Sequence, residues 1–329
     1  MLRIVYFGTS PFAVPPLKAL FGAKGRAEVV AVVTKPDKPV GRKGELQSSP
    51  VAKAAREAGA MLLMPASLKT EDLQERLAAL HADLFVVAAY GKIVPRAVLD
   101  LPKLGCLNLH GSLLPKYRGA SPIQAAIAAG ERETGVSLMR MDEQVDHGPV
   151  LATVAVPIDP GDTYGTLEAK LADAAADLLV AHLDDIAEGK LVPEEQPHDA
   201  ATYTAIIGRE DGFVRWDGAD AKAVERRLRA FDPWPGLYAV WTRNGRPLRL
   251  KLTDVHAIEN RPGLEPGTAF IDDEGFPAVS ARTGAVRLVQ VQPEGKKPMD
   301  GKAFLNGYKD FAGAELDLAE PSVPPPASK

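Results

Sequence analysis

The sequence predicts an α/β protein of two domains, in which an open sheet with helices precedes a small β-barrel. Three observations support this prediction. The chain has 329 residues, more than one hydrophobic core usually serves. Its first half alternates short apolar strands with helical patterns, which is typical of βα units. Its last third contains one amphipathic helix followed by several short strands with regular turn signals, which is typical of a barrel.

The elements of the first domain follow from apolar runs and the residues that end them. Leu2–Phe7 is rich in β-branched and aromatic residues and ends at Gly8, and Ser10-Pro11 then opens a helix. This first βα unit lacks the glycine-rich fingerprint of a dinucleotide site. The same criteria predict strands at 28–33, 61–64, 84–89, 106–110, 136–141 and 150–156, and helices at 50–58, 70–80, 121–130 and 163–189.

The second domain follows a linker at 190–208. An amphipathic helix at 221–231 precedes strands predicted at 236–241, 248–255, 267–271, 278–281 and 285–291. The last nine residues contain four prolines. We therefore expect a disordered tail over 312–329.

Composition and charge exclude several classes of protein. Hydrophobic residues make up 46% of the chain and charged residues 25%, as in ordinary globular proteins, and no apolar run is long enough to span a membrane. The single cysteine, Cys106, excludes an internal disulfide and fits a reducing cytosol, so we expect a cytoplasmic protein. The net charge of −4 gives no general attraction to nucleic acid. Residues 208–309 have 17 Lys and Arg against 14 Asp and Glu, which weakly favours a polyanionic partner there.

The stretch 105–119 is the centre of the predicted site. Alternate side chains of a strand share one face, so Asn108 and His110 offer an amide and an imidazole on the same side. Gly111 lets the backbone approach a ligand just beyond the strand end, where open α/β sheets bind ligands. We expect Cys106, on the same face, to be a packed residue and not a nucleophile.

Residues 34–50 form a long basic segment between predicted elements. The segment has more cations than carboxylates, namely Lys35, Lys38, Arg42 and Lys43 against Asp37 and Glu45. Loops of this length usually have a function or are disordered. Two interpretations stay open, a solvated loop and a flexible arm that closes on phosphates.

The connection 142–149 is acidic and contains a glycine, so it can bring a carboxylate to the strand-end rim. Asp142 and Asp146 are both candidates, although aspartates are also common turn residues. With Asn108 and His110, Asp146 would form an acyl-transfer site without a covalent nucleophile: the amide donates to a developing oxyanion, and the carboxylate orients the imidazole. No serine elbow and no histidine pair at metal-ligand spacing is present, so no metal is expected.

These motifs resemble a known family. Leu107 to Pro115, followed by Tyr117-Arg118-Gly119 and by Asp146-x-Gly148, is similar to the signature of the folate-dependent formyltransferases. Further motifs narrow the resemblance to members that act on an aminoacylated tRNA: Thr34 to Pro39 with Gly41-Arg42, Ala88 to Gly91, Ser121 to Gln124, Arg229 to Pro235 and Gly295 to Lys297. The resemblance covers residues 1 to about 311.

The resemblance implies a Rossmann-like catalytic domain over 1–189, a linker over 190–208 and an OB-fold-like, tRNA-binding β-barrel over 209–311. It implies transfer of the formyl group of 10-formyltetrahydrofolate to the amino group of methionyl initiator tRNA, a step of translation initiation. Asn108, His110 and Asp146 match the catalytic residues. The positions that match the folate site are Tyr90, Gly91, Ile93, Ser112, Leu113, Leu114, Pro115, Gln144 and Val145, and those assigned to tRNA are Lys38, Arg42, Lys43, Lys296 and Lys297.

Two departures and three rival functions stay open. His147 stands where the family more often has a small residue, and we expect it to face water and not to tune Asp146. Ser48-Ser49-Pro50 varies the usual end of the arm, which leaves the details of tRNA contact open. The rivals are a formyltransferase for a small amine such as a nucleotide sugar or glycinamide ribonucleotide, a formyltetrahydrofolate hydrolase, and a non-catalytic RNA-binding protein. We expect a monomer.

Overall fold

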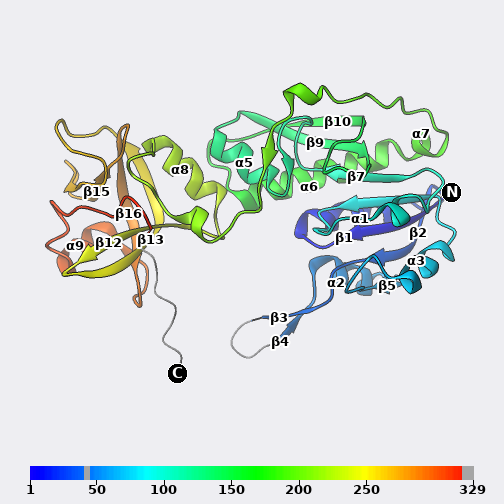
Figure 1. Ribbon diagram of the computed structural model, residues 1–329, viewed down its shortest axis with the longest axis horizontal. Helices are drawn as coiled ribbons and strands as arrows, with labels where there is room; N and C mark the ends of the chain where they lie inside the picture. The colour runs from blue at the N-terminus through cyan, green and yellow to red at the C-terminus, as the bar shows by residue number, and fades with distance from the viewer. Residues whose placement is uncertain (41–44, 321–329) are drawn as a thin grey trace. The chain divides into compact units, whose positions relative to one another are not determined.

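The computed structural model describes residues 1–40 and 45–320 (Figure 1). The chain forms two compact units. The first contains residues 1–126, 132–160 and 166–206, and the second contains residues 127–131, 161–165 and the chain from 207 onward. Residues 190–206, which we predicted to be part of a linker, thus belong to the first unit. The reason is that Tyr203 and Thr204 pair with Arg118 and Gly119.

The first unit is built on a seven-stranded sheet with the strand order β10-β9-β7-β6-β1-β2-β5. The strands from β7 to β5 in this order are parallel, whereas β9 is antiparallel to both β7 and β10. Their bounds are β1 Leu2–Gly8, β2 Ala27–Val33, β5 Leu62–Leu63, β6 Leu84–Ala88, β7 Cys106–His110, β9 Glu133–Arg140 and β10 Val150–Pro157. The parallel order brings the carboxyl ends of β1, β6 and β7 to one edge, as the site prediction requires.

Both faces of the central strands are covered, which explains their nearly continuous apolar sequences. All five residues of β6 are buried. On one face, Phe7, Phe85 and Cys106 pack in a core cluster with residues of α3 and α4. Cys106 is 2% exposed, in agreement with its predicted packing role. The helices are α1 Val14–Gly22, α2 Pro50–Glu57, α3 Glu71–Ala78, α4 Arg96–Leu99, α5 Pro122–Ala129, α6 Tyr164–Ala181 and α7 Leu183–Ala187.

Helix ends differ from prediction in two places. The predicted helix 163–189 is divided into α6 and α7, with His182 at the N-cap of the second helix. The helix predicted over 70–80 is α3, which spans Glu71–Ala78; Thr70 is its N-cap residue, but the Thr70 side chain makes no capping hydrogen bond. Among the described residues, no helix is long and apolar enough to cross a membrane.

The basic segment 34–50 contains a hairpin that extends away from the sheet (Figure 1). Strand β3 (Lys38–Val40) pairs antiparallel with β4 (Glu45–Gln47). The base is held by hydrogen bonds between Thr34 and Ser49 at 2.8 Å and from Ser48 Oγ to Asp37 Oδ2 at 3.0 Å. Arg42 and Lys43 lie outside the described residues.

The second unit is an antiparallel sheet with the order β12-β13-β16-β15-β14, and β17 pairs with β16. The bounds are β12 Leu237–Arg243, β13 Arg246–Ile258, β14 Ala269–Ile271, β15 Pro277–Ser280, β16 Ala285–Pro293 and β17 Met299–Asp300. Helix α8 (Ala221–Ala230) packs against β13. The sequence reasoning missed α9 (Gly301–Gly307), although Asp300 is a clear capping signal: its side chain accepts from the N–H groups of Lys302 and Ala303.

Residues 314–317 join the two ends of this sheet. The N–H of Ala269 donates to Ala314, the N–H of Leu316 donates to Gly267, and the N–H of Asp317 donates to Val240 in β12. The Leu316 side chain is 3% exposed. The prediction of a disordered tail was therefore wrong for residues 312–320, because this segment satisfies main-chain groups at two sheet edges. The rest of that predicted tail, 321–329, lies outside the described residues.

Candidate active site

Strand β7 presents Asn108 and His110 at the edge where the parallel strands end. The alternation along the strand buries Leu107 and Leu109 on the opposite face, as predicted. His110 is 6% exposed and Asn108 is half-buried. The alternation of side chains along β7 is therefore enough to place Asn108 and His110 on the same face of the sheet.

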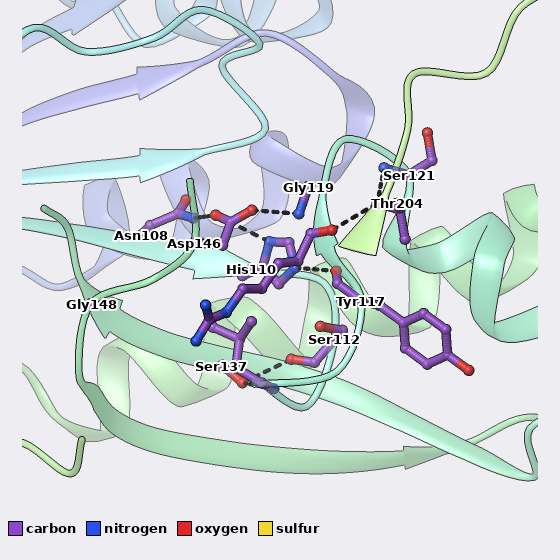
Figure 2. A network of polar contacts seen from close by, with 12 residues as sticks. Asn108, His110, Ser112, Tyr117, Gly119, Ser121, Ser137, Asp146, Gly148 and Thr204 are labelled. Carbon is purple, nitrogen blue, oxygen red and sulfur yellow. Dashed lines mark hydrogen bonds and ion pairs between the residues drawn. The ribbon is translucent and has the colours of Figure 1, made fainter. Parts of the chain in front are cut away.

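Asp146 joins these two side chains, as Figure 2 shows. Asn108 Nδ2 donates to Asp146 Oδ1 at 3.2 Å, and His110 Nδ1 lies 3.6 Å from the same oxygen. The other carboxylate oxygen accepts from the Gly119 N–H at 2.8 Å. The three predicted catalytic side chains thus meet, with Asp146 oriented by a side-chain amide and a backbone N–H.

The imidazole of His110 is fixed from its other nitrogen as well. Nε2 lies 2.9 Å from the carbonyl oxygen of Tyr117, which can only accept a hydrogen bond. Both ring nitrogens therefore face acceptors. Nε2 therefore carries a proton that it donates to Tyr117, whereas Nδ1 lies at ion-pair distance, and not at hydrogen-bond distance, from Asp146.

The loop after β7 is held by two serines. Ser112 Oγ donates to the carbonyl of Lys116 at 2.6 Å, while Ser137 Oγ donates to the carbonyl of Ser112 at 2.8 Å and accepts from the Leu114 N–H at 3.0 Å. Ser112 is fully buried, so its side chain shapes the loop. Leu113, Leu114 and Pro115 are half-buried and offer an apolar surface.

The other residues predicted to bind folate divide into two groups. The Tyr90 ring is 2% exposed and packs edge-on against Phe7, and burial raises the pKa of its hydroxyl to about 12. Only the backbone of Tyr90 is available at the rim. Gly91, Ile93, Gln144 and Val145 are exposed, with Ile93 at 79% and Val145 at 60%.

Lys35 adds positive charge beside Gly91. Gly91 has φ +70°, which favours glycine, and a Cβ there would make Lys35 Nζ move. Partial burial and the nearby Lys38 and Lys92 lower the pKa of Lys35. The positive charge of these lysines at this edge favours an anionic ligand.

Asp142, the other candidate carboxylate, contacts His147 and not Asn108 or His110 within the described chain. It lies 2.7 Å from Nδ1 of His147, and the His147 ring stacks on His198 with centroids 4.1 Å apart. The expectation that His147 faces water holds in part, because its side chain is 27% exposed while its edge and one face also have protein partners. It makes no recorded contact with the Asp146 carboxylate within the described chain.

Sequence reasoning missed the contribution of residues 196–204. Gln196, His198, Thr202 and Thr204 contact the loop and the turn that carry the site, although they follow Asp146 by at least 50 positions. Gln196 stands in a segment rich in Pro and Glu, without periodicity or motif. No signal in the sequence indicates its contacts.

The described residues contain no group of three or more His, Cys, Asp or Glu side chains arranged to hold a metal ion.

Comparison with known proteins gives the family. The formyl transferase profile matches residues 2–183, and the profile of the formyl transferase C-terminal domain matches residues 206–309. Over 318 residues the chain is 42% identical to the methionyl-tRNA formyltransferase of Aromatoleum aromaticum, covering 97% of this chain and 98% of that protein. The chain belongs to the methionyl-tRNA formyltransferase family.

Other relatives agree over almost their whole length. The methionyl-tRNA formyltransferase of Marinobacter nauticus is 39% identical over 318 residues, covering 96% of this chain and all of that protein. Among solved structures, the sugar 3N-formyl transferase WlaRD has a TM-score of 0.61 at 20% identity and covers 90% of this chain and 99% of that chain. HypX from Aquifex aeolicus in complex with tetrahydrofolic acid has a TM-score of 0.57 at 17% identity. The match covers 98% of this chain and 50% of that chain. At these identities the structural likeness shows the fold alone.

Proposed function

We propose that this chain transfers the formyl group of 10-formyltetrahydrofolate to the amino group of methionyl initiator tRNA, giving N-formylmethionyl-tRNA for translation initiation. The observation that supports it most is the 42% identity, over nearly the full length, to methionyl-tRNA formyltransferases. The proposal includes action as a monomer in the cytoplasm, with no metal ion.

The contacts of Asn108, His110 and Asp146 support direct attack of the neutral methionyl amine on the formyl carbonyl. One N–H of Asn108 is committed to Asp146, so the amide keeps a second N–H for the developing oxyanion. A protonated His110 stabilises the same negative charge. Asp146 supports the imidazolium and takes up the proton of the amine through a water molecule, and this proton passes to N10 of tetrahydrofolate as the bond between N10 and the formyl carbon breaks.

Folate binding is assigned to the exposed positions around this site. The half-buried Leu113, Leu114 and Pro115 form one apolar wall, and Ile93 and Val145 contribute further exposed apolar surface. Gly91 and Gln144 offer backbone and amide groups, which fits a pocket with few polar contacts. Tyr90 contributes through its main chain, because its ring is buried. Ser112 contributes by shaping the loop.

The acceptor tRNA is assigned to two basic regions. Lys38 is exposed on β3 of the hairpin, and Arg42 and Lys43 follow it in the sequence. Lys296 and Lys297 are exposed in the second unit. Cations of this kind bind phosphates without reading sequence, so we propose that they position the tRNA.

The test is formyl transfer from 10-formyltetrahydrofolate to methionyl initiator tRNA, beside reactions with uncharged tRNA, glycinamide ribonucleotide, a nucleotide amino sugar or no acceptor. Transfer that requires the aminoacylated tRNA and falls in Arg42→Ala supports the proposal. Release of formate without acceptor indicates the hydrolase, and transfer to a small amine indicates the other formyltransferases. Binding of RNA without any turnover indicates the non-catalytic protein.

A further inference from the structure

The turn that carries Asp146 needs support from outside itself. Asp146 has φ +50°, in the left-handed region that few residues other than glycine adopt, although aspartate tolerates it better than most. At Gly148, a Cβ would lie 2.1 Å from the carbonyl oxygen of Arg140. A strained backbone of this kind persists only where its surroundings over-determine it.

Gln196 supplies this support from the segment that follows α7. Its Nε2 donates to the carbonyl oxygen of Asp146 at 3.0 Å and to that of Gly148 at 2.6 Å. One amide group thus holds both ends of the three-residue turn. The side chain of Asp146 is held separately, through Asn108 and Gly119.

Arg118 determines which way the Gln196 amide points. Its Nε and Nη2 donate to Gln196 Oε1 at 3.1 and 2.7 Å. A guanidinium has only donors, so it must face the amide oxygen, and the amide nitrogen then faces the two carbonyls. Arg118 is 1% exposed and Gln196 is 5% exposed. Within the described residues, the recorded side-chain partners of Arg118 are Gln196, Tyr203 and His198, none of which is a carboxylate.

A second contact reaches the same turn through His198. Its Nδ1 lies 2.9 Å from Arg118 Nη2, so this nitrogen accepts and is unprotonated. Its ring stacks on that of His147 with an interplanar angle of 4°, and His147 directly follows Asp146. Arg118 is therefore the common anchor for two groups that hold the turn.

We propose that Gln196, oriented by Arg118, is a positioning residue that keeps Asp146 in its working conformation. The inference rests on the proposed function of Asp146. Neither residue touches a reacting atom: Gln196 acts on the backbone of Asp146, and Arg118 acts on Gln196. By this inference the segment that follows α7 and contains Gln196 is part of the active site.

The decisive substitution is Gln196→Glu, which keeps the size of the side chain. The new carboxylate still accepts from Arg118, so the buried guanidinium is not left unpaired. A carboxylate has no N–H, however, so it cannot donate to the carbonyls of Asp146 and Gly148. Glu195→Gln is the matched control, because Glu195 is an exposed neighbour in the same segment. Hydrogen exchange of the free proteins tests the effect on the turn without any substrate.

We expect exchange in peptides covering residues 142–149 to be about tenfold faster in Gln196→Glu, with global unfolding unchanged and Glu195→Gln like the wild type. Unchanged exchange in that segment overturns the proposal, whatever reaction the protein catalyses. Faster exchange throughout the first unit also overturns it, since it shows a general structural role.

Kinetics provide the second measurement. In formyl transfer, Gln196→Glu should lower kcat by about ten- to a hundredfold, the range expected for buried acceptors left unpaired, with KM for both substrates within about threefold. In an Asp146→Ala background the same substitution should cost less than about twofold, because its effect passes through Asp146. Equal losses in both backgrounds overturn the proposal. An inactive wild type contradicts the proposed function instead. The hydrogen-exchange measurement then still tests whether Gln196 stabilises the turn that carries Asp146.

Discussion

Asn108 Nδ2 donates to Asp146 Oδ1 at 3.2 Å, which leaves one N–H of the amide for a ligand. Removing an oxyanion donor typically costs about 2.7–4 kcal/mol. Asn108→Ala should therefore lower kcat by roughly two to three orders of magnitude while folate binding stays within about threefold. Steady-state kinetics and folate titration check both numbers. Turnover within about threefold of the wild type would contradict the role of the amide.

Asp146→Asn removes the negative charge 3.6 Å from His110 Nδ1. The loss of proton uptake and of imidazolium support should reduce kcat by about 10²–10⁴-fold. Asp142→Asn is the matched control, because Asp142 lies in the same connection but faces His147. Its contact with His147 is partly exposed and is therefore worth little, so we expect an effect below about fivefold. Similar losses of kcat in both variants would show that the negative charge of this connection matters, and not the position of Asp146 beside His110.

Gly119 donates its N–H to Asp146 and adopts φ +106°. A Cβ there would lie 2.3 Å from the carbonyl oxygen of Thr204. Gly119→Ala should lower the free energy of unfolding by about 1–3 kcal/mol and reduce kcat as well. Gly161→Ala serves as control, because its Cβ would meet nothing within 4 Å. Urea unfolding of both variants tests the prediction, which fails if the two behave alike.

Cys106 is buried, and burial raises the pKa of its thiol to about 12. Because only the thiolate reacts, about one molecule in ten thousand is reactive at pH 8 even before access is considered. The native protein should resist iodoacetamide at pH 8 and react at once in denaturant. Mass spectrometry measures the adduct. Rapid native alkylation would place Cys106 in a different environment.

Leu316 belongs to the segment that joins the two ends of the second sheet. Its side chain is 3% exposed, whereas that of Leu318 is 41% exposed. Leu316→Ala should destabilise the protein by about 2–5 kcal/mol, and Leu318→Ala by much less. Thermal unfolding of the two variants provides the comparison. Equal stability would show that residues 314–317 add nothing to the folded unit.

Much of the fold was predictable because burial leaves a clear pattern in the sequence. Strands such as Leu84–Ala88 have continuous apolar sequences since both of their faces are covered. Helix α9 was missed because seven residues are too few for a periodicity to show, and the capping Asp300 was the only signal. The segment 312–320 was misjudged because its ordering comes from main-chain hydrogen bonds to strands that lie far away in the sequence.

The face on which the polar residues of β7 lie follows from its sequence. The two-residue period of a strand places Asn108 and His110 on one side, and the glycine and proline residues that follow produce the loop. The sequence also limited the carboxylate to two candidates. The contacts of Asp146 with Asn108 and of Asp142 with His147 are seen in the folded chain and not in the sequence. The same holds for Gln196, which reaches the Asp146 turn across 50 positions. The pattern of apolar and polar residues indicates which side chains are buried. Contacts between residues far apart in the sequence depend on how the whole sheet folds.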